Sequence, residues 1–307
     1  MINNPKISVL VPFFGAFDPR RLELAISSTL QAEKDEKIEF LICTGKEAIP
    51  LGNAVDITEI VRKAQEIRGD PSKVISKGSI YNQGIKKVQG DYVYLSDSDI
   101  IFPEHFFSGL IQASESANSP LYRPMMRRLL LQDFETFYLS YLQNGIRDSL
   151  KSLDFSQEFI VKPDKNPRDI RVFKKFENGR MKTFIVPGED YEEYISNPSN
   201  RGSEPKFFNQ DRHCGATFAK RKQLEDIGGC CEEFKSWGCW DADLQWKLKD
   251  TYGLSYIPGE VIHLDHPKGY FDRERWKLNR LLQETRRAKG ATKCVQEDRE
   301  VYAGQLK

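Results

Sequence analysis

Short apolar runs alternate with stretches of helical periodicity over the first 95 residues. Strands are predicted where a run is β-branched or aromatic and apolar on both faces: residues 6–14 (KISVLVPFF), 37–43 (KIEFLIC) and 92–95 (YVYL). Helices are predicted where apolar residues recur every three to four positions: residues 19–31, 57–67 and 76–88. The alternation predicts an α/β fold, with a mainly parallel central sheet flanked by helices and right-handed crossovers.

The pattern is less regular after residue 95. We predict helices at 103–117 and within 121–145, then a long insertion to residue 206 that contains some strand and is rich in Pro, Asn and Gly. Regular structure resumes with strands at 214–219 and 254–257 and a helix that starts near Asp241. These boundaries predict one domain over 1–270, made of the halves 1–119 and 207–270 around an insertion at 120–206. A helical tail follows at 271–307.

Two carboxylates follow the buried run at 92–95. Asp97 and Asp99 are two residues apart, and in an extended segment such side chains point the same way. Open α/β sheets bind ligands at the carboxyl ends of their strands, and paired carboxylates there suit a hard divalent cation. The alternative is an ordinary loop in which the aspartates cap or turn the chain.

A further candidate carboxylate is Asp241, in the first turn of a predicted helix. A carboxylate is favoured there by the helix dipole and the exposed N–H groups, so Asp241 can be a helix cap, a catalytic group or both. His263 and His266 follow the last predicted strand, where a lone histidine is commonly structural.

Composition narrows the class of partner. The chain has 46 Lys and Arg against 45 Asp and Glu, a balance that does not point to nucleic acid. The N-terminus has no basic segment before its first apolar run, and we expect neither a signal peptide nor a transmembrane helix. No Cys-x-x-Cys pair occurs among the six cysteines, so reduced thiols and a cytoplasmic protein are expected.

Several motifs resemble GT-A fold (Rossmann-like) nucleotide-diphospho-sugar transferases. The first half resembles the family-two glycosyltransferases in Pro12-Phe13-Phe14, Asn82-Gln83-Gly84 and Asp97-Ser98-Asp99. The second half resembles the module of β-1,4-galactosyltransferases and chondroitin-polymerase-like enzymes. It carries that resemblance in Gly215–Phe218, Ile227-Gly228-Gly229, Glu232-Glu233, the segment from Trp237 to Leu244, and His263.

The resemblance implies an inverting glycosyltransferase that uses Mn²⁺ or Mg²⁺ and moves a hexose or N-acetylhexosamine from a UDP-sugar to a glycan or lipid-linked glycan. Asp241 is its expected base. The expected nucleotide-sugar contacts are Pro12, Phe13, Phe14, Lys77, Asn82, Asp97 and Ser98. The expected acceptor contacts are Trp237, Trp240 and Asp243. The expected metal ligands are Asp99 and His263, with Asp97 and His266 as further candidates.

The chain also departs from these families. The second predicted strand ends in Cys43-Thr44-Gly45 rather than in a base-contacting Asp, and Trp240 replaces a Glu of the second-half motif. Trp240 is therefore either an acceptor platform or a core aromatic residue. Other functions to be distinguished are an inactive carbohydrate-binding or scaffold protein and a sugar-nucleotide pyrophosphorylase, although the glycine- and basic-rich loop of a pyrophosphorylase is missing after residue 14. The basic helical tail suits peripheral contact with an anionic inner membrane face.

Overall fold

The computed structural model describes most of the chain, as two compact units. The described residues are 6–13, 18–32, 38–51, 56–67, 76–129, 133–151, 159–163, 169–175, 181–187, 207–208, 212–236, 238–264, 266 and 272–304. The first unit takes Met1–Pro124, Cys214–Gly259 and His266–Lys307, and the second takes Met125–His213 and Glu260–Asp265.

A seven-stranded sheet lies at the centre of the first unit, in the order β13-β6-β12-β4-β1-β2-β3. The strands are β1 (Ile7–Pro12), β2 (Ile38–Cys43), β3 (Ala48–Pro50), β4 (Tyr92–Leu95), β6 (Leu121–Tyr122), β12 (Thr217–Lys220) and β13 (Ser255–Tyr256). β1, β2, β4, β6 and β13 run in one direction, and β3 and β12 run against them. The predicted α/β fold with a mainly parallel central sheet is confirmed.

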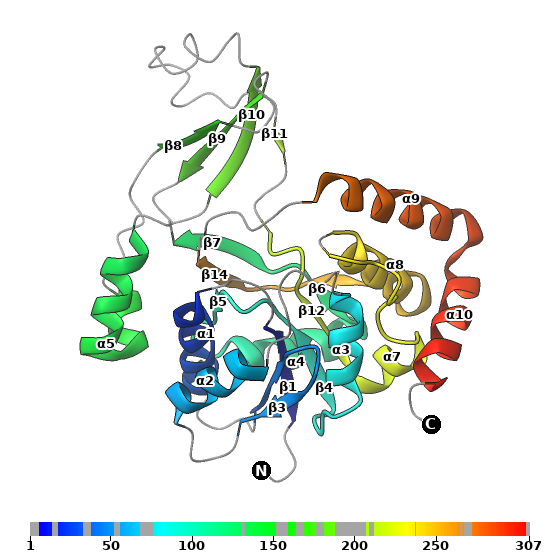
Figure 1. Ribbon diagram of the computed structural model, residues 1–307, viewed down its shortest axis with the longest axis horizontal. Coiled ribbons are helices and arrows are strands. Elements are labelled where there is room, and N and C mark those ends of the chain that lie inside the picture. The colour runs from blue at the N-terminus through cyan, green and yellow to red at the C-terminus, as the bar shows by residue number, and fades with distance from the viewer. Residues whose placement is uncertain are drawn as a thin grey trace. The chain divides into compact units, whose positions relative to one another are not determined.

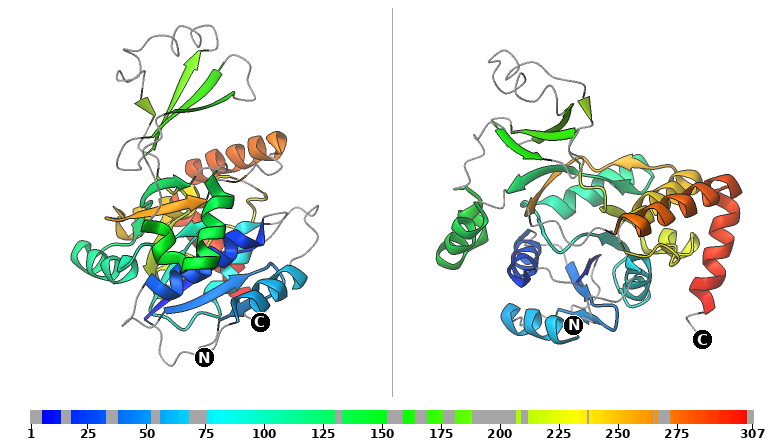
Figure 2. Two further views of the ribbon diagram at one scale, coloured as in Figure 1. Left: turned by 90° about the vertical axis from the view of Figure 1, so that its left-hand side faces the viewer. Right: turned by 45° about the horizontal axis from the view of Figure 1, so that its top comes forward.

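Helices cover both faces of this sheet, as the predicted crossovers require (Figure 1). The helices of this unit are α1 (Pro19–Ala32), α2 (Ile57–Ile67), α3 (Lys77–Ile85), α4 (Phe106–Ala117), α7 (Arg221–Asp226) and α8 (Trp240–Tyr252), with α9 (Arg273–Lys289) and α10 (Ala291–Gly304) outside them. α10 packs on α7 and α8 and follows α9 directly (Figure 2). The short strand β5 (Ile100–Ile101) precedes α4.

Strand β4 shows how the sequence pattern becomes two cores. Val93 and Leu95 point to one face, where they join the apolar cluster that also includes residues of α3, α7, α8 and α10. Tyr94 points to the other face, where its ring packs edge-on against aromatic residues of α4 at centroid distances of 5.7 and 5.8 Å. Both faces of the strand are buried, as its uninterrupted apolar run predicts.

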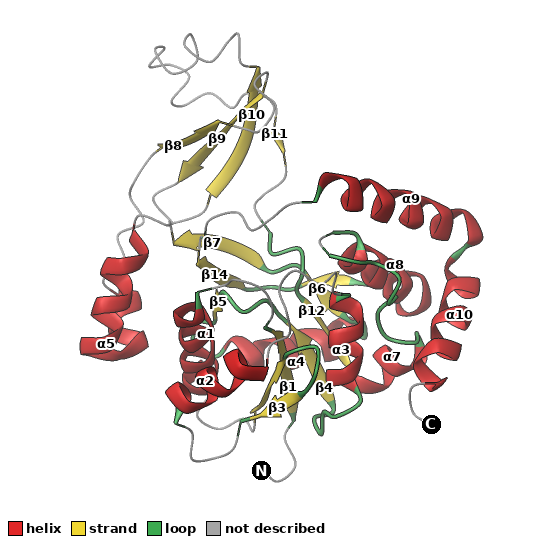
Figure 3. Ribbon diagram, viewed as in Figure 1, coloured by secondary structure: helices red, strands yellow, loops and turns green. Residues whose placement is uncertain are grey.

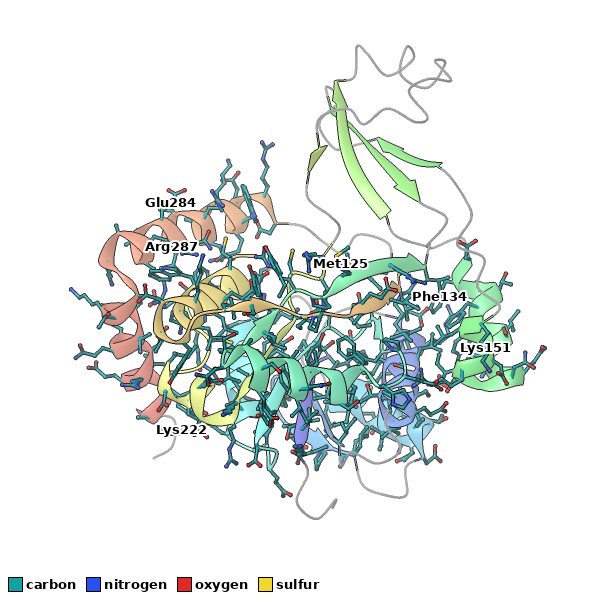
Figure 4. All side chains as sticks on the ribbon, turned by 180° about the vertical axis from the view of Figure 1, so that it is seen from behind. Met125, Phe134, Lys151, Lys222, Glu284 and Arg287 are labelled. Atoms are coloured by element: carbon teal, nitrogen blue, oxygen red, sulfur yellow. The ribbon has the colours of Figure 1, made fainter. Side chains whose placement is uncertain are left out.

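The C-terminal helices are an integral part of the first unit. Arg286 of α9 and Lys247 of α8 are buried and form ion pairs with Asp243 of α8 and Asp298 of α10. The exposed side of α9 carries other charges, among them Glu284 and Arg287 (Figure 4). The segment predicted as a tail therefore holds α8 through buried charges.

The second unit contains two groups of paired strands. β7 (Met125–Leu129) pairs in parallel with β14 (Glu260–Leu264). The strands β8 (Phe159–Pro163), β9 (Asp169–Lys175), β10 (Met181–Pro187) and β11 (Phe207–Phe208) form an antiparallel sheet (Figure 3). The helix α5 spans Phe134–Lys151, with non-helical backbone at Gly145. The helix predicted within 121–145 is thus wrong over Met125–Leu129, because pairing with β14 overrides the helical propensity of Met, Arg and Leu.

Two further expectations concern membranes and thiols. Among the described helices, none has both the length and the apolar composition needed to cross a membrane. All six cysteines are free thiols, and only Cys214 is exposed. Burial raises the pKa of the Cys43 thiol to about 12, so this thiol is an inert core group rather than a nucleophile.

Candidate functional site

The site begins where β4 ends. Gly90 lies just before β4 in the sequence and packs against Ser8 of β1. A Cβ atom at position 90 would come within 2.6 Å of the Ser8 hydroxyl oxygen, so only glycine fits there. Ser96 follows the last residue of β4, and its carbonyl accepts a hydrogen bond of 2.5 Å from the Tyr81 hydroxyl of α3. This bond fixes the start of the turn that carries Asp97, Ser98 and Asp99.

Asp97 and Asp99 have different partners in this turn. Asp97 is partly exposed and accepts a hydrogen bond from the Lys77 ammonium group. Asp99 is buried, and its Oδ2 lies 3.1 Å from Nε2 of His266. The segment is a turn rather than an extended chain, and its two carboxylates have different partners.

Lys77 is the first residue of α3, which is capped by the Ser76 hydroxyl through a bond of 3.2 Å from the Ser79 amide. Its ammonium group lies 5.1 Å from the ring centroid of Trp240 and 5.9 Å from that of Tyr81. The two rings are themselves 5.0 Å apart. A cation on aromatic faces is stabilised by the ring quadrupoles. The aromatic pair therefore holds Lys77 between the end of β4 and the start of α8.

Asp241 follows Trp240 in the first turn of α8. The chain reaches this helix through Gly238 and Cys239, which both have left-handed φ values, 96° and 70°. Burial raises the pKa of Asp241, while its backbone hydrogen bond and the charges of Lys77 and Arg123 act in the opposite direction. A carboxylate with a raised pKa near two cations has the properties of a general base.

Asp99 and His266 can hold a metal ion within the first unit. Their facing oxygen and nitrogen atoms are 3.1 Å apart. Two neighbouring ligands of an octahedral ion at about 2.1 Å each would be about 3 Å apart, so the pair fits such an ion as well as a direct hydrogen bond. Mixed imidazole and carboxylate ligands suit Mn²⁺ better than Mg²⁺. His263 lies on β14 in the second unit.

Two of the predicted site residues have structural contacts. Asn82 is buried, its Oδ1 accepts from the Cys230 amide at 2.8 Å, and its side-chain amide donates to the Cys230 carbonyl and to Glu232. Asp243 is fully buried, and both of its carboxylate oxygens accept hydrogen bonds from Arg286, at 2.9 and 3.1 Å. Asn82 thus joins α3 to the loop before α8, and Asp243 joins α8 to α9.

The remaining predicted site residues that the structure describes are buried or lie at the end of a strand. Pro12 ends β1, and Phe13 is fully buried with its amide donating to the Cys43 carbonyl at 2.8 Å. Ser98 is buried in the turn between the two aspartates. Trp240 is 4% exposed, which favours the core-aromatic interpretation over an open acceptor platform. Phe14 and Trp237 lie outside the described residues.

Three residues of the site were not predicted from the sequence: Tyr81, Arg123 and Gln245. Gln245 is four residues after Asp241, a spacing that places both on one face of α8, and this signal was available. Its Oε1 accepts a 2.9 Å hydrogen bond from Nε of Arg123, which follows β6. No local pattern marks Arg123, because its role depends on a contact with a helix far away in the sequence.

Three comparisons with known proteins were made, by family model, by sequence and by structure. The chain matches no protein-family model, and no curated protein matches its sequence. A solved structure of glucosyl-3-phosphoglycerate synthase from Mycobacterium tuberculosis, in complex with Mn²⁺, uridine diphosphate and phosphoglyceric acid, is similar at 14% identity and a TM-score of 0.37. That match covers 86% of this chain and 72% of the other. At so low a TM-score, the interpretation of the site rests on its own residues.

Proposed function

We propose that this chain is a metal-dependent, inverting glycosyltransferase with a GT-A fold. It moves a hexose or N-acetylhexosamine from a UDP-sugar to a hydroxyl of a glycan or lipid-linked glycan. One observation carries the proposal: Lys77 pairs with Asp97 and lies over the ring of Trp240, the residue before Asp241. Lys77 is thus a shared partner of Asp97 at the end of β4 and of Trp240 at the start of α8. The donor site and the base of one reaction have to be close together, and this arrangement meets that requirement.

Asp99 and His266 would hold the metal ion. His263, the other histidine predicted as a ligand, precedes His266 by three residues in the sequence. A bound Mn²⁺ ion would neutralise the charge of the departing diphosphate. Asp97 would contact the ion or the donor together with Lys77, whereas the buried Pro12 and Phe13 would support the nucleotide-sugar site from within the fold.

The reaction needs a base on the face of the donor sugar opposite the diphosphate. The acceptor oxygen forms a bond to the anomeric carbon while the bond from that carbon to the phosphate oxygen breaks, and UDP leaves with the bonding electrons. The proton of the acceptor hydroxyl passes to the carboxylate of Asp241. A single displacement of this kind inverts the configuration at the anomeric carbon.

The first experiment measures binding and turnover separately. Calorimetry with UDP in Mn²⁺ and in EDTA tests the metal, and UDP release from a panel of UDP-hexoses and UDP-N-acetylhexosamines tests catalysis. We expect tight UDP binding only with Mn²⁺, and UDP release from at least one donor. Equal affinity in EDTA would refute the role of the metal. Metal-dependent UDP binding with no release from any donor and acceptor would favour the inactive scaffold.

The second experiment concerns the base. Asp241→Asn keeps the shape of the side chain but cannot accept the proton, so we expect kcat to fall about 10²-fold or more with UDP affinity unchanged. Asn caps a helix about as well as Asp, so a purely capping role predicts little change. Asp250→Asn, an exposed position on the same helix, is the matched control. Near-normal turnover of a folded Asp241→Asn protein would exclude Asp241 as the base.

A further inference from the structure

Arg123 is held in a defined position beside α8, the helix that carries Asp241 in its first turn. Its backbone has a left-handed φ of 50°, and its amide donates to the Ala216 carbonyl at 3.2 Å. Its Nε donates to Oε1 of Gln245 at 2.9 Å. Gln245 is buried, and its own amide donates to the Cys214 carbonyl at 2.8 Å. Gln245 is thus one anchor of this guanidinium group, and its own side chain is fixed by hydrogen bonds at both ends.

The anchored cation is bonded to the helix that carries the proposed base. Asp241 and Gln245 lie one turn apart on the same face of α8, about 6 Å between Cβ atoms. The positive charge of Arg123 lowers the pKa of Asp241, which agrees with this proximity. Because Asp241 must approach the acceptor hydroxyl, a planar guanidinium fork beside it lies on the acceptor side of the reaction.

An aromatic pair continues from Arg123 along the edge of the sheet. The guanidinium carbon lies 5.5 Å from the ring centroid of Tyr122 on β6. The Tyr122 ring stacks on that of Tyr256 on β13, with centroids 4.6 Å apart and planes at 15°. Tyr256 is 53% exposed, although large aromatic residues are usually buried. Flat aromatic faces offer a sugar ring apolar contact area with little loss of side-chain entropy on binding.

We propose that Arg123, Tyr122 and Tyr256 form an acceptor subsite for a sugar that carries a negatively charged group, a carboxylate or a phosphate. The proposal rests on the proposed function, since it assigns the acceptor of the same reaction. The guanidinium group binds the anionic oxygens, and the tyrosine faces support the ring or the next residue of the glycan. Gln245 is a positioning residue, because it acts on the acceptor through Arg123.

The test compares acceptors that differ only in charge. The probes are p-nitrophenyl β-glucuronide against p-nitrophenyl β-glucoside for the carboxylate, and glucose 6-phosphate against glucose for the phosphate. For the preferred anion we expect Arg123→Gln to lower kcat/KM about 10- to 100-fold, through KM, while the neutral partner changes less than about threefold. Arg62→Gln, which removes an exposed arginine charge on α2, is the control and should leave both values unchanged.

Calorimetric binding of the same probes separates this proposal from the proposed function. If no donor is turned over, the transferase assignment fails, yet tighter binding of the anionic probe that Arg123→Gln abolishes would still support the subsite. Arg123→Lys keeps the charge and should restore part of the preference, and Tyr256→Ala should weaken both members of a pair equally. Turnover or binding with no preference for either anionic probe overturns the subsite and leaves the transferase assignment intact. The subsite is also overturned if folded Arg123→Gln and Arg123→Lys proteins keep the same preference for the anionic probe as the unsubstituted protein.

Discussion

The buried charges between α8, α9 and α10 should be essential for stability, and Arg286→Met tests this directly. Arg286 is 2% exposed and donates to Asp243 from Nε at 2.9 Å and from Nη2 at 3.1 Å. It also donates to Asp298 from Nη2 at 2.6 Å and from Nη1 at 3.3 Å. Methionine fills a similar volume without charge. The substitution leaves Asp243 buried without this cation, and Asp298 with Lys247 as its remaining ionic partner in the cluster.

The expected loss of stability follows from this geometry. Removing one partner of a buried ion pair lowers the free energy of unfolding by about 3–5 kcal/mol, because the remaining carboxylate is buried away from water without a compensating positive charge. For a unit of this size, 1 kcal/mol corresponds to roughly 2–4 °C in Tm, so we expect Tm to fall by about 6–20 °C. Thermal unfolding followed by circular dichroism, with urea unfolding as an independent measurement, gives both quantities.

The double variant Asp243→Leu with Arg286→Met isolates the charge effect. It removes one charge of each sign and leaves the pair between Lys247 and Asp298 intact, so it should be clearly more stable than Arg286→Met alone. Arg280→Met, on the exposed side of α9, should change Tm by less than about 2 °C. A loss below about 1 kcal/mol in Arg286→Met, or a double variant less stable than the single one, would refute the reasoning.

Three further predictions concern the site. Asp99→Ala should weaken Mn²⁺ binding at least about 10-fold by calorimetry, and unchanged affinity would exclude Asp99 as a ligand. Because the pKa of Asp241 is raised, kcat/KM should fall on the acid side with an apparent pKa above 3.8. The charge of Lys77 lowers the pKa of Asp241, so Lys77→Gln should shift this apparent pKa further upward. A downward shift would contradict the reasoning. A raised carboxyl pKa stabilises the folded state below about pH 4, and this stability is lost as the pH rises through the raised value. Asp241→Asn should therefore have a higher Tm than the unsubstituted protein at pH 7, and a lower one would show the sign to be wrong.

Local patterns were sufficient to predict the part of the fold that contains Asp97 and Asp99. The runs that became β1, β2 and β4 are apolar on both faces, and each stretch between them has helical periodicity, so parallel pairing follows from general rules. Met125–Leu129 could not be predicted in this way. Its residues favour a helix, and only the partner strand β14, far away in the sequence, makes it a strand.

Site residues could be predicted from the sequence where a strand end or a helix start marks them, as for Asp97, Asp99 and Asp241. Asp243 lies in the segment from Trp237 to Leu244 that carries the resemblance, and it was predicted as an acceptor contact. Two residues along a helix correspond to about 200° of rotation, however, and Asp243 points away from Asp241 toward α9. Arg123 was missed because long-range contacts alone give it a role.

The same rotation explains why the C-terminal helices matter for the proposed chemistry. Asp241 and Gln245 form one i, i+4 pair on α8, and Asp243 and Lys247 form another on its opposite side. The second pair is locked by Arg286 and Asp298, which leaves α8 no freedom to turn about its axis without separating buried charges. The rotation of α8 sets the direction of Asp241 and, through Gln245, the position of Arg123. The proposed base and the proposed acceptor cation are thus oriented by ion pairs on the opposite face of the helix.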